Sequence, residues 1–226
     1  MILARIAAAA ARSGRDATAV QLVGISKTVP LDRVAAAAAA GLTSMGENRV
    51  QEAAPKVAAL PGVEWHLVGQ LQGNKAGRAI ELFDVIQSVD SVALAERLSR
   101  LAGERTVRIL LQVNIDSDPA KSGFPASDLD VDLDRVLGLP GLRVEGLMTV
   151  GRLVERAEDA RSTFIGLRRL SEDLRSGHGG LGAGLSMGMS DDFEIAVEEG
   201  ATIVRVGRAL FGDRPAPTFG GRPAAG

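Results

Sequence analysis

Lys27 ends an apolar, β-branched segment and is the first residue whose position suits covalent chemistry. Within residues 20–27, strand alternation places Val23, Ile25 and Lys27 on one face. If that face lines the inside of a barrel, Lys27 reaches the mouth, where partial desolvation favours the neutral amine that forms Schiff bases. The alternative is a strand-end lysine that extends its ammonium group into water.

Arg205 is the second candidate, because it interrupts another apolar segment. Alternation within residues 202–207 puts Ile203, Arg205 and Gly207 on one face. An arginine on the inner face of a strand needs a partner, since an unpaired buried charge is costly. That partner is either a ligand or the carboxylate of a structural ion pair, and the sequence leaves both open.

An anion site is indicated where Ser190 is followed by the acidic pair Asp191 and Asp192. A hydroxyl and free backbone N–H groups at the start of a helix bind anions. Gly207 marks another loop where backbone can approach a ligand, and barrels often hold phosphate between their last two loops. Ser190 is equally suited to be a plain helix cap. The two aspartates would repel phosphate unless they point away.

Three further polar residues lie in expected strands or in the loop after one. Asn48 ends one strand, His66 lies within the next, and Lys121 belongs to a polar loop over residues 116–124. Each has an ordinary explanation: a loop cap, a packed or surface imidazole, and an exposed lysine. Their common placement near strand ends is more informative than any one of them.

The elements that must position these residues alternate along the chain. Eight short apolar segments predict strands, at residues 20–27, 42–48, 64–69, 85–90, 108–115, 142–150, 184–190 and 202–207. Amphipathic helices are expected between them, at residues 31–40, 49–60, 74–83, 92–101, 127–137, 153–174 and 193–199, with Gly200 ending the last. An alanine-rich helix opens the chain.

This alternation predicts an α/β protein with a parallel sheet, closed into a single (β/α)8 TIM barrel after an extra N-terminal helix. An open doubly wound sheet is the alternative. We expect residues 1–212 to form one domain, and residues 213–226, rich in Pro, Gly and Ala, to be a disordered tail. Because a barrel builds its site at the carboxyl ends of its strands, the candidate residues would converge there. We expect a monomer.

Composition excludes several classes of function. The net charge is −2 and basic residues are scattered, so no nucleic-acid surface is expected. The chain has no cysteine and two histidines, which argues against thiol chemistry and a histidine-rich metal site. No apolar run is long enough to span a membrane, and we read no signal peptide in the first residues, so a cytoplasmic location is expected.

An ordered set of motifs resembles the YggS/PROSC family of pyridoxal phosphate homeostasis proteins over about residues 5–212. The most specific string is Leu185-Ser186-Met187-Gly188-Met189-Ser190-Asp191-Asp192. The others are Gly24-Ile25-Ser26-Lys27-Thr28, Gly46-Glu47-Asn48, Trp65-His66-Leu67-Val68-Gly69, Leu71-Gln72 with Asn74-Lys75, Lys121-Ser122-Gly123, Gly146-Leu147-Met148, Val204-Arg205-Val206-Gly207 and Ala209-Leu210-Phe211-Gly212.

The resemblance implies an alanine-racemase N-terminal barrel without that enzyme's second domain, holding pyridoxal 5′-phosphate (PLP). It implies that Lys27 carries the cofactor as a Schiff base, that Arg205 faces the pyridine nitrogen and that Asn48 lines the cofactor. It places the phosphate near Ser186, Met187, Ser190, Gly207 and Arg208. Lys121 matches a lysine linked in the family to secondary handling of the cofactor.

Three positions depart from the family pattern. Gln70 occupies a position where members often have His, and Val29 one where a second lysine is frequent. Arg208 replaces a frequent Thr, so any phosphate contact there must come from its charge or from backbone.

These residues favour a role in vitamin B6 homeostasis over enzymatic turnover. An arginine beside the pyridine nitrogen disfavours its protonation and so weakens PLP as an electron sink. The chain has no tyrosine, which leaves Lys27 as the one candidate acid or base. We therefore expect a carrier or regulator that supplies PLP to PLP-dependent apo-enzymes. The alternatives are a slow amino-acid racemase, and a lyase or aldolase in which Lys27 attacks a phosphorylated carbonyl substrate.

Overall fold

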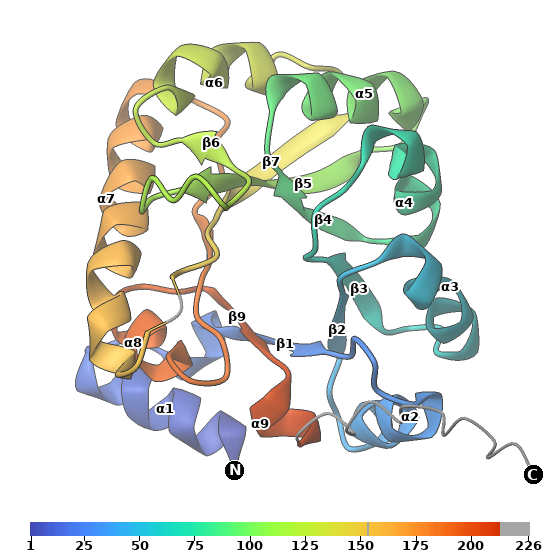
Figure 1. The fold of residues 1–226 in the computed structure, drawn as a ribbon, viewed down its shortest axis with the longest axis vertical. Coiled ribbons are helices and arrows are strands. Elements are labelled where there is room, and N and C mark those ends of the chain that lie inside the picture. The colour runs from blue at the N-terminus through green and yellow to red at the C-terminus, as the bar shows by residue number, and fades with distance from the viewer. Residues whose placement is uncertain (153, 213–226) are drawn as a thin grey trace, which may run out of the picture.

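Eight parallel strands close into a barrel in the computed structural model, which describes residues 1–152 and 154–212 (Figure 1). The strands of the barrel are β1 (Gln21–Ile25), β2 (Ser44–Glu47), β3 (Glu64–Leu67), β4 (Val85–Val89), β5 (Val107–Asn114), β7 (Leu142–Met148), β8 (Gly184–Ser186) and β9 (Ile203–Val206). β1 pairs with both β2 and β9, and β4 pairs with β5, so the ring has no free edge. The predicted (β/α)8 barrel is confirmed, and the open doubly wound sheet is excluded.

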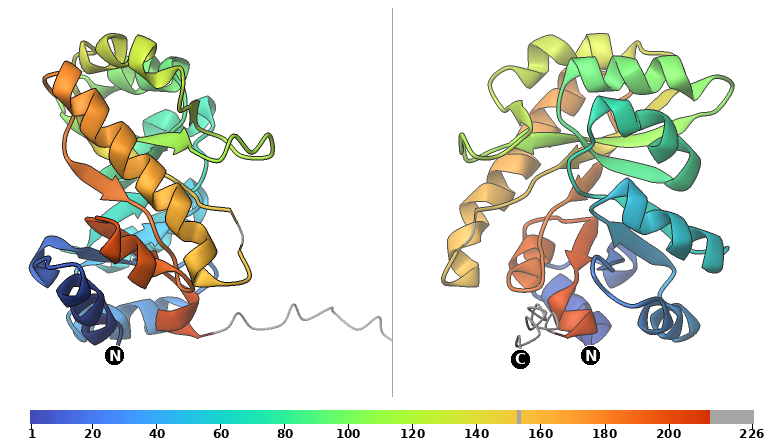
Figure 2. Two further views of the ribbon diagram at one scale, coloured as in Figure 1. Left: turned by 90° about the vertical axis from the view of Figure 1, so that its left-hand side faces the viewer. Right: turned by 45° about the vertical axis from the view of Figure 1, so that its right-hand side comes forward.

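Helices surround the strands on the outside of the ring (Figures 1 and 2). They are α1 (Ile2–Arg12), α2 (Leu31–Ala39), α3 (Val50–Ala59), α4 (Ala76–Leu82), α5 (Val92–Ala102), α6 (Leu129–Leu137), α7 (Arg161–Gly177), α8 (Phe193–Glu198) and the short α9 (Arg208–Phe211). Gly200 follows α8 with a φ of +106°, a conformation that ends helices and suits glycine. None of the helices among the described residues is long and apolar enough to cross a bilayer.

Several expected boundaries are wrong, for local reasons. The helix expected over residues 153–174 begins at Arg161, after a 3-10 turn at Ala157–Ala160. Just before the expected start, the backbone and guanidinium of Arg152 bond the Asp116 carboxylate. β8 ends at Ser186 rather than at residue 190, since the last residues form a loop over the barrel. β6 (Phe124–Pro125), which pairs with β5, is too short to leave a periodic pattern. Residue 153 and the expected tail, 213–226, lie outside the described residues.

Two kinds of packing fill the barrel. The main apolar core lies between strands and helices and includes Trp65, Phe164 and Phe193. A small second cluster of Val23, Leu110, Met148 and Ile203 lies apart from it. Beside this second cluster the interior is polar, with buried side chains such as His66, Gln87, Ser186 and Arg205. The barrel therefore buries several polar side chains in its interior, and among these four Arg205 lines the opening at the carboxyl end.

The N-terminal helix α1 packs on α8, next to the last strands of the ring (Figure 2). Arg5 donates to both oxygens of Glu194, at 3.2 and 2.9 Å. Arg15, just beyond α1, donates to the carbonyls of Val197 and Ala201 at the end of α8, at 2.5 and 2.9 Å. These bonds fix the helix that follows the Ser190 loop.

Candidate functional site

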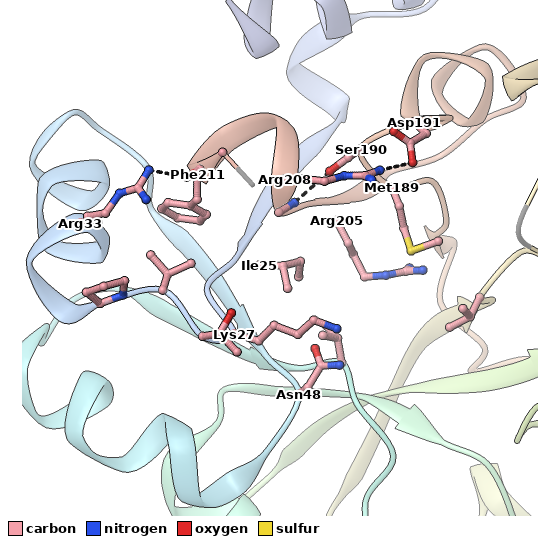
Figure 3. Close-up of a pocket in the computed structure, with 17 residues that line it drawn as sticks. Ile25, Lys27, Arg33, Asn48, Met189, Ser190, Asp191, Arg205, Arg208 and Phe211 are labelled. Carbon is pink, nitrogen blue, oxygen red and sulfur yellow. Dashed lines mark hydrogen bonds and ion pairs between the residues drawn. The ribbon is translucent and has the colours of Figure 1, made fainter. Parts of the chain in front are cut away.

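A cavity of about 690 Å³ lies at the carboxyl end of the barrel (Figure 3). Its lining comes from strand ends and the loops that follow them, and it includes six of the eight residues predicted as ligands: Lys27, Asn48, Ser190, Arg205, Gly207 and Arg208. Apolar walls are added by residues that the sequence did not indicate, among them Val68, Val150 and Phe211. We call this space the carboxyl-end cavity.

Lys27 is presented by a tight turn that directly follows β1. The backbone N–H of Val29 donates to the carbonyl of Ser26 at 3.0 Å, and Thr28 between them has a φ of +63°. A positive φ is costly for a β-branched residue, so the turn needs support from its surroundings. Lys56 of α3 supplies some of it, because its ammonium group donates to the same Ser26 carbonyl at 2.6 Å.

A buried ion pair supports this turn from behind. The Glu47 carboxylate, at the end of β2, is fully buried and accepts from Lys56 and from the Ser26 hydroxyl at 2.6 and 2.7 Å. The pair joins the ends of β1 and β2 to α3. Removing either charge would leave the other buried and unpaired, which is strongly destabilising. The strand end that carries Lys27 is therefore held rigidly.

Asn48 lies directly after β2 and points into the cavity near Lys27 (Figure 3). Its backbone runs close to Gly69, where an added Cβ would lie 2.3 Å from the Asn48 carbonyl oxygen. Glycine at position 69 thus allows the loops after β2 and β3 to pass each other, which places the Asn48 amide at the cavity wall.

Arg205 is buried on the inner face of β9, as the alternation predicted. Its guanidinium donates to the Ser186 hydroxyl at 2.6 Å and to the Thr149 carbonyl at 2.7 Å. No carboxylate among the described residues forms an ion pair with it. Burial lowers the pKa of Arg205 to about 10, and the negative charge of Asp192 acts in the opposite direction. Arg205 is thus a buried cation that a ligand at the cavity could still satisfy.

The loop after β8 and the start of α9 form an anion-binding corner. The Ser190 hydroxyl accepts from the backbone N–H groups of Gly207 and Ala209, both at 3.3 Å. These donors gather where a phosphate oxygen could replace the hydroxyl. The Arg208 guanidinium adds a positive charge and pairs with the Asp191 carboxylate (Figure 3). The structure thus brings together the groups of the expected loop-to-loop anion site, and the binding of an anion there stays a prediction.

The two aspartates beside this corner have opposite surroundings. Asp192 is turned inward, and its carboxylate accepts from the Met189 backbone N–H at 2.6 Å. Burial raises the pKa of Asp192 despite that bond. Asp191 is exposed and is neutralised by Arg208. A φ of +91° at Gly188, with α8 too close for a Cβ, lets the loop adopt this path.

Ser186 and Met187 are not among the residues that line the cavity, and their expected place near a phosphate stays a prediction. The Ser186 side chain is fully buried, where it accepts from Arg205 and donates to the Gln87 carboxamide oxygen at 2.6 Å. Met187 is also fully buried, and its N–H is bonded to the Ile203 carbonyl within the sheet. Because β8 ends at Ser186, these residues belong to the barrel wall, and Ser190 is the one that reaches the opening.

Lys121 lies apart from the cavity lining, in the loop after β5. Its ammonium nitrogen is 4.0 Å from an Asp116 oxygen and 3.7 Å from an Asp118 oxygen. Gln70 donates to the Ser122 hydroxyl of the same loop at 2.8 Å. Any handling of a ligand by Lys121 stays a prediction.

The opposite, amino end of the barrel also contains a hollow, of about 800 Å³, with Gln21, Arg143 and Glu145 among its lining residues. Its charged groups are satisfied by one another. Glu145 accepts from Arg108 and Arg143 at 2.7 and 2.6 Å, and Arg108 also donates to Glu64 at 2.6 Å. We call Glu64, Arg108, Arg143 and Glu145 the amino-end cluster. Polar groups that could still bind a ligand are therefore found at the carboxyl end.

Comparison with known families matches residues 2–215 to the model described as the alanine racemase N-terminal domain. The chain is 43% identical to the pyridoxal phosphate homeostasis protein of Pseudomonas aeruginosa, over 94% of this chain and 93% of that protein. It is 40% identical to the protein of the same name from Aquifex aeolicus, over 94% of this chain and 95% of that one.

Solved structures agree. PipY of Synechococcus elongatus without PLP superposes with a TM-score of 0.84 and 44% identity, covering 94% of this chain and all of that chain. The same protein with PLP bound gives a TM-score of 0.82 at 42% identity. An alanine racemase of Clostridium difficile matches with a TM-score of 0.74 at 12% identity, over 95% of this chain and 56% of its own, which shows a shared fold.

Proposed function

The chain belongs to the family of pyridoxal phosphate homeostasis proteins, and from this membership we propose that it binds PLP in the carboxyl-end cavity, as a Schiff base on Lys27. The observation that carries the proposal is the meeting of three groups in one cavity. These are a lysine at a strand end, a buried arginine that forms no direct ion pair with a carboxylate of the described residues, and a loop that gathers backbone N–H donors.

The chemistry of this donor set fits the cofactor. Lys27 supplies the amine for the aldehyde, and Asn48 lies beside it on the wall. Ser190, Arg208 and the N–H groups of Gly207 and Ala209 would hold the phosphate. Arg205 would donate to the pyridine nitrogen. In this assignment Ser186 acts through Arg205, and Met187 has no contact with the cofactor.

We propose that the protein carries or buffers PLP within cellular vitamin B6 homeostasis and supplies it to PLP-dependent apo-enzymes, rather than turning over a substrate. PLP acts as an electron sink when its pyridine nitrogen is protonated, and the Arg205 guanidinium disfavours that proton. The chain has no tyrosine to serve as a second acid or base. We further propose that residues 1–212 form one domain of a monomeric, cytoplasmic protein.

The first experiment is the visible spectrum of the protein with added PLP, followed by borohydride reduction and peptide mapping. The sequence has four lysines, Lys27, Lys56, Lys75 and Lys121, so the modified residue can be assigned without ambiguity. A yellow band that disappears in Lys27→Ala but persists in Lys75→Ala is expected. Trapping on another lysine, or no band at saturating PLP, would contradict the proposal.

A second experiment separates carriage from turnover. Loaded protein is mixed with a PLP-dependent apo-enzyme, and recovery of that enzyme's activity is compared with an equal concentration of free PLP. Faster recovery than with free PLP is expected, and Lys27→Ala should give no advantage. Solvent deuterium appearing at Cα of alanine in the presence of the loaded protein would instead favour an enzyme with Lys27 as its base.

A further inference from the structure

A continuous chain of hydrogen bonds runs along the barrel interior from Arg205 to Glu64. Arg205 bonds Ser186 at 2.6 Å, and Ser186 bonds Gln87 at 2.6 Å. Gln87 bonds His66 Nδ1 at 2.8 Å, and His66 Nε2 bonds Glu64 at 3.0 Å. The middle three side chains are fully buried. We call these five residues the interior chain.

The two ends of the interior chain dictate its direction. A guanidinium can only donate hydrogen bonds and a carboxylate can only accept them. The Ser186 oxygen accepts from Arg205, so the Ser186 hydroxyl proton must point to an acceptor, which is the Gln87 carboxamide oxygen. The Gln87 amide nitrogen is then the atom that faces His66.

The direction continues through the imidazole. Since the Gln87 NH2 group donates to Nδ1, that nitrogen carries no proton, and the proton of the neutral ring is on Nε2. Nε2 then donates to the Glu64 carboxylate, which completes the chain. For a neutral imidazole each link has one donor and one acceptor, and turning the Gln87 amide over would put its oxygen against the unprotonated Nδ1.

We propose that the interior chain positions Arg205, so that His66 and Gln87 determine how the cofactor's ring nitrogen is met although neither touches the cavity. This rests on the proposed function. If the Gln87 amide turned over, its NH2 group would face Ser186, so the hydroxyl would have to turn its proton away and its oxygen would accept from both Gln87 and Arg205. The direction of the lone pair that Arg205 uses would then change, and the guanidinium would shift about its bond to the Thr149 carbonyl.

Other charged groups near the interior chain do not duplicate its effect. Glu64 also accepts from Arg108, which is bonded in turn to Glu145, so the carboxylate end stays anchored. At the other end, Asp192 acts on Arg205 through space and bonds the Met189 backbone. Among the described residues, the orientation of the guanidinium therefore depends on Ser186 and Thr149.

The ligand-free protein provides the first test, by long-range proton–nitrogen NMR of its histidines at pH 8. The sequence has two histidines, so two sets of signals are expected. His178 bonds the exposed Asp130 and Asp134, whereas His66 is buried, and this difference in surroundings allows the two sets to be assigned. His66 is expected as the Nε2–H tautomer, with Nδ1 showing the shift of a hydrogen-bond acceptor. A proton on Nδ1 would overturn the proposal whether or not the protein binds PLP.

Two substitutions then test the effect on the cavity. Gln87→Glu removes the donor to His66, and Gln87→Met keeps the length of the side chain without either hydrogen bond; exposed Gln51→Glu is the control. Each Gln87 variant should weaken PLP binding about threefold to tenfold, which is the effect expected when the one hydrogen bond from Arg205 to the cofactor is lost. The absorption band of the bound cofactor should also shift, while borohydride still labels Lys27.

The outcomes separate this inference from the proposed function. If the wild type binds no PLP, the proposed function fails, and the tautomer of His66 still decides the direction of the interior chain. If the wild type binds PLP and the Gln87 variants keep its affinity and band position, the positioning role is wrong. Should Gln87→Glu not fold, Gln87→Met and the wild-type NMR experiment decide.

Discussion

Two arginines inside the same barrel have opposite surroundings. Arg108, in the amino-end cluster, donates to the Glu64 and Glu145 carboxylates at 2.6 and 2.7 Å, and these bonds raise its pKa. Arg205, toward the carboxyl end, donates to a hydroxyl and a backbone carbonyl, and burial lowers its pKa. The first guanidinium is neutralised by the protein. The second forms no direct ion pair with a carboxylate of the described residues, and Asp192 acts on it only through space.

This difference suggests that the charged residues at the amino end stabilise the fold, whereas Arg205 at the carboxyl end serves a ligand. Matched charges at the amino end close the interior and contribute to stability. An unmatched buried cation costs stability, and such groups concentrate at sites where a ligand completes the interaction. The comparison predicts that substitutions at the two arginines affect different measurements.

The largest expected effect is on stability, from Arg108→Leu. It leaves Glu64 and Glu145 partly buried without the arginine that they share, which should lower the free energy of unfolding by about 2–3 kcal/mol. Urea denaturation of the ligand-free protein measures this, with exposed Arg100→Leu as control. PLP affinity should change little. Equal stability of the two variants would show that the amino-end cluster is not structural.

Arg205→Leu should give the reverse result. Relief of the buried charge offsets the loss of two hydrogen bonds, so stability without ligand should stay within about 1 kcal/mol of wild type. PLP affinity should fall about tenfold to a hundredfold, since a hydrogen bond from a charged donor is lost. Denaturation and a PLP titration measure both. A large loss of stability with unchanged affinity would assign Arg205 to the fold.

The loss of stability at low pH should arise mainly from the amino-end cluster. The hydrogen bond from His66, assisted by Arg108 and opposed by burial, holds the pKa of Glu64 well below its usual value. A carboxylate with a depressed pKa stabilises the fold fully at pH values above its pKa in the unfolded chain, which is about 4.3. This contribution is lost as the pH falls from there through the pKa in the folded protein. Glu64→Gln should therefore flatten the fall of the melting temperature between pH 5 and 2. Parallel curves for variant and wild type would refute this.

The smallest expected effect is at the rim of the carboxyl-end cavity. Asp191 competes with a phosphate for Arg208, and both side chains are exposed. Since exposed ion pairs contribute about 0.2–1 kcal/mol, Asp191→Asn should strengthen PLP binding by about twofold to fivefold. Pyridoxal, which has no phosphate, is the control ligand and should bind both proteins alike. A gain for pyridoxal as well would place the effect elsewhere.

Local pattern was enough to predict the barrel and the cavity-facing lysine and arginine. The alternation that put Arg205 inside β9 needs only the strand itself. Periodicity could not locate the start of α7, because the 3-10 turn at Ala157–Ala160 directly before it continues the helical spacing of apolar residues. It also gave no sign of the buried hydrogen bond between Ser186 and Gln87, because Gln87 comes from β4 across the barrel. A polar Gln87 on the inner face of an apolar strand was the available indication of the interior chain.

The pairing of β1 with β9 joins the two ends of the described chain at the cavity. On the ribosome, Lys27 is made well before Arg205, Gly207 and Arg208. At a synthesis rate of about 5–20 residues per second, roughly 10–40 seconds separate them. Throughout that time a nascent chain would contain the lysine without the β9 end of the cavity. If the cavity binds PLP as proposed, stable binding would begin when β9 docks, so that bound PLP would indicate a completed barrel.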